Sequence, residues 1–167
     1  MNNLSYRNAT KSDLGTIVDI YNSTVASRMV TADTAPVSVE SREKWIEEHD
    51  STYRPLWIVE DDLRKVIGWV SFQSFYGRPA YQATVEISIY LAETARGKGF
   101  GKSILSYCLN IAPTFGVRTL LAYIFAHNEP SIKLFRQFVF EEWAFLPNIA
   151  MMDGQEYGLK ILGKRIG

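Results

Sequence analysis

Residues 84–103 read TVEISIYLAETARGKGFGKS. The first eight, Thr84–Leu91, are rich in β-branched and aromatic side chains, which predicts a buried strand. The run Arg96–Lys102 is basic and contains three glycines, and apolar residues at helical spacing follow it to about Ile111. Such an arrangement can hold a phosphate group, because glycine lets the backbone approach closely and the first N–H groups of a helix face the anion.

Two common phosphate-binding patterns fail on this basic turn. Gly101, Lys102 and Ser103 match the end of a Walker A loop, but Arg96 stands where that motif opens with glycine. The dinucleotide pattern fails because Lys102 takes the place of its last glycine. A nucleotide-binding protein therefore remains a distant alternative, which tight binding of ATP would revive.

The composition favours a single folded domain. The chain has 167 residues, of which 47% are hydrophobic, enough for one domain over residues 1–167 with its own core. The 18 basic and 18 acidic side chains balance, which argues against nucleic acid as a partner. No apolar run approaches membrane-spanning length and the polar N-terminus does not resemble a signal peptide, so we expect a cytoplasmic protein without a membrane partner.

Cys108 is the single cysteine of the chain. It cannot form an internal disulfide, and no cysteine-based metal site is available. Its place on an apolar helical face predicts a buried structural thiol rather than a nucleophile.

The hydrophobic pattern predicts the order β-α-α-β-β-β-α-β-α-β-β, a mixed α/β sheet with helices on both faces. Helices are expected after Thr10 or Ser12, after Ser38, after the basic turn and after Asn128, with Ser131 as a second choice for the last, because these side chains can cap a helix. The strands are expected at residues 4–9, 56–60, 66–75, 84–91, 119–125, 139–146 and 157–162, the last two joined by a turn at 153–154.

The pattern that does fit the basic turn is R-x-x-G-x-G, formed by Arg96, Gly99 and Gly101. It resembles the acyl-CoA pyrophosphate loop of the GNAT N-acetyltransferase superfamily, and the predicted order of elements is similar to the GNAT fold from end to end. The sequence between residues 21 and 140 resembles the phosphinothricin and methionine-sulfoximine acetyltransferase branch of this superfamily. The matching residues are Tyr21-Asn22, Thr31, Pro36, Ser38, Glu40, Trp45, Ala80-Tyr81, Thr84-Val85-Glu86, Ser88, Tyr90, Asn128, Ser131, Leu134 and Phe140.

This resemblance implies that acetyl-CoA is the acyl donor, without a metal, and that the enzyme is a homodimer, with Trp143 available for a subunit interface. Asn128 would contact the pantetheine arm or hold a water, although it can equally be a plain helix N-cap, and Ser131 would lie near the coenzyme sulfur. A bulge in the central strand would free the backbone of Ile89, Tyr90 and Leu91 to pair with pantetheine. The pyrophosphate would lie on the N–H groups of Arg96, Gly97, Lys98, Gly99, Phe100, Gly101 and Lys102.

Glu86 is the candidate catalytic base. It stands between Val85 and Ile87, where a carboxylate is costly unless it faces a polar cleft or has a partner. An amine must be neutral to attack a thioester, so a base must accept the proton of the ammonium, directly or through a water. Burial would raise the pKa of Glu86 from about 4.3 toward neutrality and improve it as a base. The alternative is an ion-paired structural glutamate.

The reaction implied is acetyl transfer to the primary amine of a small amino-acid-like acceptor, of the phosphinothricin or methionine sulfoximine type. Such an acceptor carries a carboxylate or phosphinate, which an arginine can bind bidentately. Arg78 is the first choice and Arg28 the second, though either can be a surface residue. Trp45, Trp57 and Trp69 are assigned to the core. The residues expected on the acceptor side are Thr31, Phe75, Tyr76, Arg78 and Tyr81.

Three residues depart from the resembled pattern. Phe135 stands where many members have Tyr or His, so the general acid is absent or supplied elsewhere, with His127 as a nearby alternative. Val139 replaces a common glycine and must take another backbone path or carry strain. Ala32 replaces a bulky aromatic, which predicts a wider or reshaped acceptor pocket. Two other functions stay open: a GNAT enzyme acting on a protein or peptide amine, and a non-catalytic acyl-CoA-binding domain.

Overall fold

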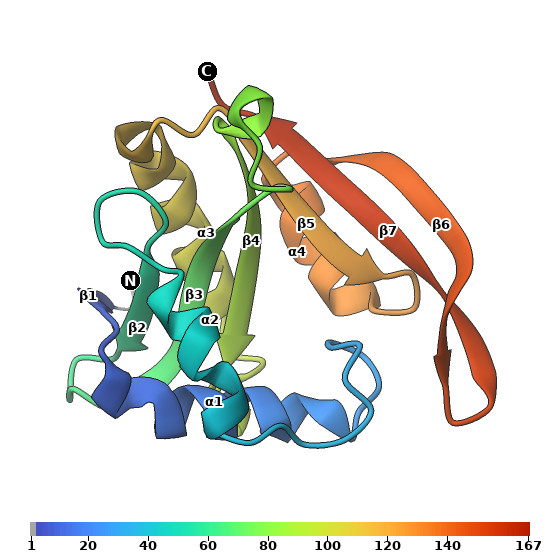
Figure 1. The fold of residues 1–167 in the computed structure, drawn as a ribbon, viewed down its shortest axis with the longest axis horizontal. Coiled ribbons are helices and arrows are strands. Elements are labelled where there is room, and N and C mark those ends of the chain that lie inside the picture. Colours follow the sequence, from blue (N-terminus) through green and yellow to red (C-terminus); the bar gives the residue numbers. More distant parts are fainter. Residues whose placement is uncertain (1–2) are drawn as a thin grey trace.

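The computed structural model describes residues 3–167 as one seven-stranded sheet with helices on both faces (Figure 1). The strand order is β1-β2-β3-β4-β5-β7-β6. All neighbouring strands are antiparallel except β4 and β5, which are parallel. The strands are β1 (Ser5–Asn8), β2 (Leu56–Glu60), β3 (Val66–Ser74), β4 (Thr84–Leu91), β5 (Thr119–Phe125), β6 (Glu141–Met152) and β7 (Gln155–Arg165).

Four α-helices within the described residues cover the two faces of the sheet. Helices α1 (Leu14–Val25) and α2 (Glu43–Glu47) pack on one face, and α3 (Phe100–Ile111) and α4 (Glu129–Gln137) pack on the other (Figure 1). Strand β2 serves both cores, because successive side chains point to opposite faces. Leu56 and Ile58 pack under α1 and α2, whereas Trp57 and Val59 join the core beneath α3. The predicted mixed α/β sheet is confirmed.

Strands β4 and β5 pair over a short distance and then separate (Figure 1). Their pairing runs from Thr84 opposite Thr119 to Glu86 opposite Leu121, although both strands continue. The prediction of a bulge in β4 is wrong. The pairing of β4 with β3 continues without a register shift to Leu91, which lies opposite Gly68. The backbone of β4 is freed on its other side, where β5 diverges from it.

The predicted bounds are correct for three inner strands of the sheet. Strands β2, β4 and β5 begin and end at the predicted residues. The last hairpin is longer than predicted, with β6 reaching Met152 and β7 reaching Arg165. Strand β6 contains Pro147 and a register shift between Leu146 and Ala150, which interrupts the alternation that marks a strand. The predicted turn at residues 153–154 is confirmed.

Val139 lies in the left-handed region, with φ +61°. It occupies the position after the cap of α4 in a Schellman motif: the Val139 N–H donates to Arg136 and the Phe140 N–H donates to Phe135. The rings of Phe135 and Phe140 meet at 5.0 Å between centroids, which is the apolar contact that usually accompanies this motif. Val139 therefore takes the expected glycine conformation and carries strain, because a β-branched residue fits this region poorly.

Val139→Gly is expected to raise the free energy of unfolding by about 0.5–1 kcal/mol. The strain of a left-handed valine costs about 1–2 kcal/mol, and the extra backbone freedom of glycine in the unfolded chain takes part of this gain back. The Val139 side chain is 68% exposed, so its removal leaves no cavity. Urea unfolding of the two proteins checks the prediction, and an equal or lower midpoint for the variant would contradict it.

Cys108 lies on α3 with no exposed surface, inside the core formed with the sheet, as predicted. Burial raises the pKa of its thiol well above the ordinary range. The described helices include none with the length and apolar character required to cross a membrane.

Candidate active site

Two cavities meet at three residues of β4. Alternation along the strand places Val85 and Ile87 in the core under α3 and turns Glu86, Ser88 and Tyr90 toward the face of α1 and α2. The latter three line both a larger cavity of about 600 Å³ and a smaller cavity of about 180 Å³. Glu86 therefore faces two separate spaces.

The larger cavity occupies the region where β4 and β5 diverge. Residues 87–91 of β4 line one side, residues 122–125 of β5 line the other, and side chains of α4 and of residues 30–32 close it. The free backbone edge of β4 thus faces a space rather than a strand. Among the residues expected to hold a coenzyme, those that line it are Ile89, Tyr90, Leu91, Arg96, Gly101, Asn128 and Ser131.

The basic turn leads directly into α3. Gly97 and Gly99 have φ values of +71° and +80°, and Gly99 is the N-cap of the helix, so both glycines meet a backbone requirement. The N–H groups of the first turn, including Gly101, lack helical partners and point away from the helix start. The expected residues Gly97, Lys98, Gly99, Phe100 and Lys102 lie in this turn and first helical turn, next to the larger cavity rather than on its lining.

Arg96 joins the basic turn to two other elements. Its Nη2 donates to the Ser23 hydroxyl on α1 at 2.6 Å, and its Nε donates to the Leu91 carbonyl at 3.2 Å. The guanidinium therefore fixes the end of β4 relative to α1 while it lines the larger cavity.

Asn128 is 6% exposed and both ends of its side-chain amide are used. Its Oδ1 accepts the Ser131 N–H at 3.3 Å, which makes it the predicted N-cap of α4. Its Nδ2 donates to the Met29 carbonyl at 3.0 Å, and this bond fixes the segment that carries Thr31. Asn128 is thus both a cap and a wall of the larger cavity.

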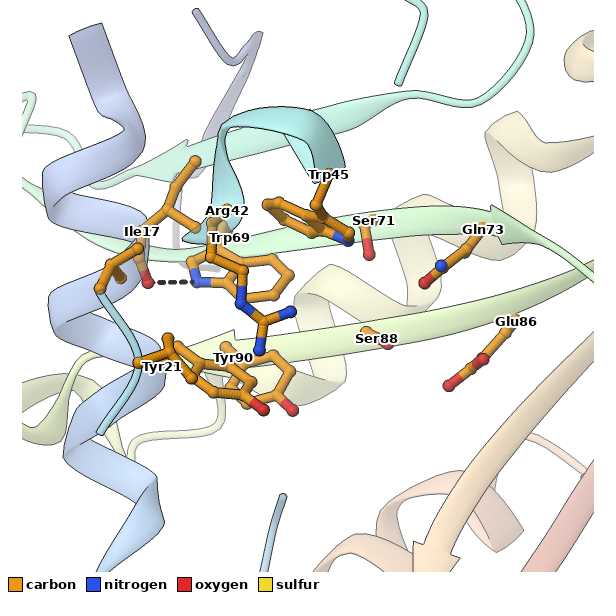
Figure 2. A pocket seen from close by; sticks show the side chains of 12 residues that line it. Ile17, Tyr21, Arg42, Trp45, Trp69, Ser71, Gln73, Glu86, Ser88 and Tyr90 are labelled. Atoms are coloured by element: carbon orange, nitrogen blue, oxygen red, sulfur yellow. Dashed lines mark hydrogen bonds between the residues drawn. The ribbon is translucent and has the colours of Figure 1, made fainter. Parts of the chain in front are cut away.

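The smaller cavity lies between α1, α2, β3 and β4 (Figure 2). Aromatic rings form one part of its wall: Trp69 stacks on Tyr90 at 4.5 Å between centroids, and Trp45 meets Trp69 edge-on at 5.4 Å. Polar groups form the rest. They are the side chains of Arg42, Ser71, Gln73, Glu86 and Ser88.

Glu86 is the acidic residue of this smaller cavity. Burial alone raises the pKa of its carboxyl, so no cation among the described residues offsets the cost of charging it. Glu86 is therefore not the ion-paired structural glutamate that the sequence left open. An isolated carboxylate with a raised pKa beside two cavities has the properties of a general base.

Most of the residues predicted for the acceptor side lie elsewhere. Phe75, Tyr76 and Tyr81 form an aromatic cluster in the connection from β3 to β4, with centroid distances of 4.7–6.3 Å. They are absent from the lining of both cavities, as is the exposed Arg78. The order of residues in a turn does not reveal toward which part of the molecule the turn is directed, so these positions could not be predicted. Thr31 does line a cavity, but the larger one.

The second arginine choice, Arg28, is also engaged outside the cavities. Its Nε donates to Asp153 at 2.8 Å in the turn between β6 and β7. The sequence did not single out Arg42, which lines the smaller cavity, and it assigned Trp45 to the core, although Trp45 is part of the cavity wall. The one sequence signal near Arg42 was the helix cap at Ser38, whose hydroxyl accepts the Ser41 N–H at 3.2 Å.

Two of the three departures from the resembled pattern line the larger cavity. Phe135 is 5% exposed and lines the cavity with an apolar ring, and Ala32 lines it as well. His127 is outside its lining: its Nε2 is 2.8 Å from the Arg28 carbonyl, and its ring lies 4.6 Å from that of Tyr157. His127 is thus a packing residue in this arrangement.

Comparison with known proteins agrees with this fold. The family model of the acetyltransferase (GNAT) domain matches residues 3–141. The chain is 52% identical to YwnH of Bacillus subtilis, a candidate phosphinothricin acetyltransferase, over 98% of this chain and 99% of the relative. It is 29% identical to an L-methionine sulfoximine/L-methionine sulfone acetyltransferase of Pseudomonas paraeruginosa, covering 92% and 87% of the two chains.

A solved structure is similar over nearly the whole length. The phosphinothricin acetyltransferase of Sinorhizobium meliloti in complex with AcCoA matches with a TM-score of 0.90 at 29% identity, covering 98% of this chain and 89% of that one. The sheet that opens between β4 and β5, the glycine turn before α3 and the match over residues 3–141 lead to one conclusion. The chain belongs to the GNAT acetyltransferases and is an enzyme of the N-acetyltransferase class.

Proposed function

We propose that this enzyme transfers an acetyl group from acetyl-CoA to the primary amine of a small amino-acid-like acceptor, of the phosphinothricin or methionine sulfoximine type. The observation that carries the proposal is the position of Glu86, whose carboxylate borders both cavities. One cavity can take the acyl donor and the other the acceptor, with the base between them. The names of the relatives in Bacillus and Pseudomonas support this class of acceptor.

The larger cavity is the proposed coenzyme site. Residues 89–91 offer a free backbone edge to the amide groups of pantetheine. The N–H groups that open α3, together with Lys98, Lys102 and Arg96, offer a positive site for the pyrophosphate. Ser131 and Asn128 border the same cavity from α4.

Glu86 is the proposed general base. Its carboxylate takes a proton from the acceptor ammonium, and the neutral amine then forms a bond to the thioester carbonyl carbon. Collapse of the tetrahedral adduct breaks the carbon–sulfur bond and releases the thiolate of CoA, and the nitrogen then passes its second proton to that thiolate or to solvent, which leaves the N-acetylated acceptor. Phe135 cannot donate a proton to that thiolate. At a pH near the pKa of the thiol, the thiolate leaves readily without a proton donor.

Thiol release from acetyl-CoA tests the reaction. The acceptor panel contains phosphinothricin, methionine sulfoximine, methionine sulfone, common amino acids and short peptides. Turnover with a small amino-acid-like acceptor supports the proposal. Preference for peptides would favour a macromolecular amine, and coenzyme binding without turnover on any acceptor would favour a non-catalytic domain.

The pH dependence tests the base. The pKa of Glu86 is raised by burial, so kcat/KM is expected to rise with pH through an acidic limb whose midpoint lies above the ordinary value of about 4.3. The limb is expected to disappear in Glu86→Gln. A pH–rate profile of each protein is the measurement, and a limb that persists unchanged in the variant would contradict the role of Glu86.

We also propose that the enzyme works as a homodimer. Strand β6 is an edge of the sheet, and Trp143, Phe145, Ile149 and Met151 are 45–60% exposed along it. Large apolar side chains on an unpaired edge favour association. Sedimentation at micromolar concentration is expected to give a dimer, and Trp143→Ser is expected to shift it toward the monomer. A monomeric parent protein would contradict the proposal.

A further inference from the structure

The smaller cavity contains opposite charges. Figure 2 shows the Arg42 guanidinium beside the Tyr21 and Tyr90 rings, and the Glu86 carboxylate farther along β4 beyond Ser88. Arg42 ends the short 3₁₀ turn that precedes α2, so its side chain enters the cavity from the side opposite β4. A ligand held in this space would meet a cation and a carboxylate at once.

Arg42 is held in place but retains free donors. Its Nη2 donates to Asp33 at 2.9 Å, and its Cζ lies 4.7 Å from the centroid of the Tyr21 ring. The Tyr21 hydroxyl also contacts Asp33 and Thr31, so the carboxylate that orients Arg42 is itself fixed. A guanidinium has five N–H donors, and the bond to Asp33 is the one side-chain hydrogen bond of Arg42 within the described residues.

The surroundings leave this guanidinium able to bind a second anion besides Asp33. Its side chain is 28% exposed, and the wall beside it consists of aromatic rings, so a charge pair formed there is screened less than at the surface. A planar guanidinium matches a carboxylate through two parallel hydrogen bonds. The two arginines predicted for this role, Arg28 and Arg78, lie outside the lining of the smaller cavity.

We propose that Arg42 binds the carboxylate of the acceptor, so that the smaller cavity selects α-amino acids whose carboxylate is free. This inference rests on the proposed function, since the amine must lie at Glu86. The charge pattern fits a zwitterion, with the ammonium at Glu86 and the carboxylate at Arg42. The volume of about 180 Å³ is below the roughly 300–1,000 Å³ of pockets for drug-sized ligands, which suits a short side chain. Peptide N-termini and polyamines lack the anion that Arg42 would bind.

The test compares an acid with its neutral amide. Steady-state kinetics are measured with L-methionine sulfone and with its α-carboxamide, for the parent enzyme, Arg42→Gln and Arg42→Lys. Arg42→Gln is expected to raise KM for the acid about 10- to 100-fold, the range of a lost charge-assisted hydrogen-bond pair, and to change KM for the amide less than 3-fold. Arg42→Lys is expected to give a KM for the acid between those of the parent and Arg42→Gln, because lysine keeps the charge and loses the paired donors of the planar guanidinium. KM for acetyl-CoA is expected to stay constant.

Lys44→Gln is the matched control, because Lys44 is an exposed cation two residues after Arg42, in α2, and is outside the lining of both cavities. It is expected to leave both KM values unchanged. Equal increases for acid and amide in Arg42→Gln would overturn the inference, since they indicate a structural role. A selective loss on the acid in Arg78→Gln would also overturn it, because the anion would then bind at the turn before β4.

Calorimetry separates this inference from the proposed function. Binding of L-methionine sulfone to the parent enzyme and to Arg42→Gln is measured in the presence of CoA, where no acetyl group is available. A parent enzyme that binds the acid at least 10-fold tighter than its amide supports the anion site even if turnover fails. A parent enzyme that turns over both equally well retains the proposed function and overturns the role of Arg42, whatever the stability of the variants.

Discussion

Glu86→Gln is expected to lower kcat for amine acetylation by about 10²- to 10⁴-fold, the usual contribution of a positioned general base. Gln has nearly the same shape and cannot accept the ammonium proton. Glu86 lies at the junction of the two cavities with no ion-pair partner among residues 3–167, so its carboxylate has no structural partner to lose. KM for acetyl-CoA is expected to change little. Single-turnover rates of CoA release are the measurement.

The same variant is expected to be more stable than the parent at neutral pH. The folded pKa of Glu86 is raised above its unfolded value, so its contribution to stability is fully present below about pH 4.3 and is lost as pH rises through the folded pKa. At pH 7 the buried charge opposes folding, and Gln removes that cost. The difference between the two melting temperatures should therefore be larger at pH 7 than at pH 4.

Glu93→Gln supplies the control for both measurements. Glu93 lies in the 3₁₀ turn after β4 and is exposed to solvent. The identical change there is expected to leave kcat and stability nearly unaltered. A Glu86→Gln variant that kept full activity would remove the base from the proposal, and one that was less stable than the parent at pH 7 would indicate an unseen partner for the carboxylate.

Gly68→Ala is expected to lower the free energy of unfolding by about 1–3 kcal/mol, the range for overpacking a tight interior. A Cβ on Gly68 would lie 2.4 Å from the Tyr90 carbonyl oxygen and 3.0 Å from a Leu91 methyl group. The obstacle at Tyr90 is backbone, which cannot rotate aside. Strand β4 would have to shift at the residues that border the larger cavity. We therefore expect weaker acetyl-CoA binding along with the loss of stability, measured by calorimetry and urea unfolding.

Gly15→Ala is the matched substitution. Gly15 lies in α1, and no neighbouring atom would come within 4 Å of an added Cβ. It is expected to raise stability by about 0.5–1 kcal/mol, because alanine favours the helix. If both variants lost the same stability, the close approach at Tyr90 would not be the cause in Gly68→Ala. If Gly68→Ala were neutral, the β3–β4 pair would have to be more pliable than its regular register indicates.

The sequence was informative where one local pattern determines the outcome. The unbroken apolar run of β2 and the basic turn before α3 could each be located to the residue, because burial on both faces and positive φ leave few alternatives. Glu86 drew its prediction from local context together with the resemblance, since a lone carboxylate between two apolar neighbours needs a special environment, and its catalytic role stays a prediction. The strain at Val139 follows from one substitution in a known helix end.

The acceptor side could not be predicted in this way. Arg42 reaches its cavity because the 3₁₀ turn that precedes α2 comes close to β3 and β4, which are distant in the sequence, and no local spacing encodes that contact. Arg78 was predicted because its turn could lean over the cleft, and Tyr81 because it matches the resembled family, yet neither a local pattern nor a resemblance sets the direction of a turn. The separation of β4 and β5 is likewise a property of the pairing of distant strands. Long-range packing therefore decides which arginine a ligand would meet.

The burial of Cys108 has a practical consequence for anyone who handles this enzyme. The chain has one thiol, and it has no exposed surface in the folded state. A thiol-reactive dye should therefore register the CoA released during catalysis without a background from the protein. The same dye, used without acetyl-CoA, should label the chain only when the core beneath α3 opens. The labelling rate of Cys108 therefore reports how often this core opens, and no engineered label is needed.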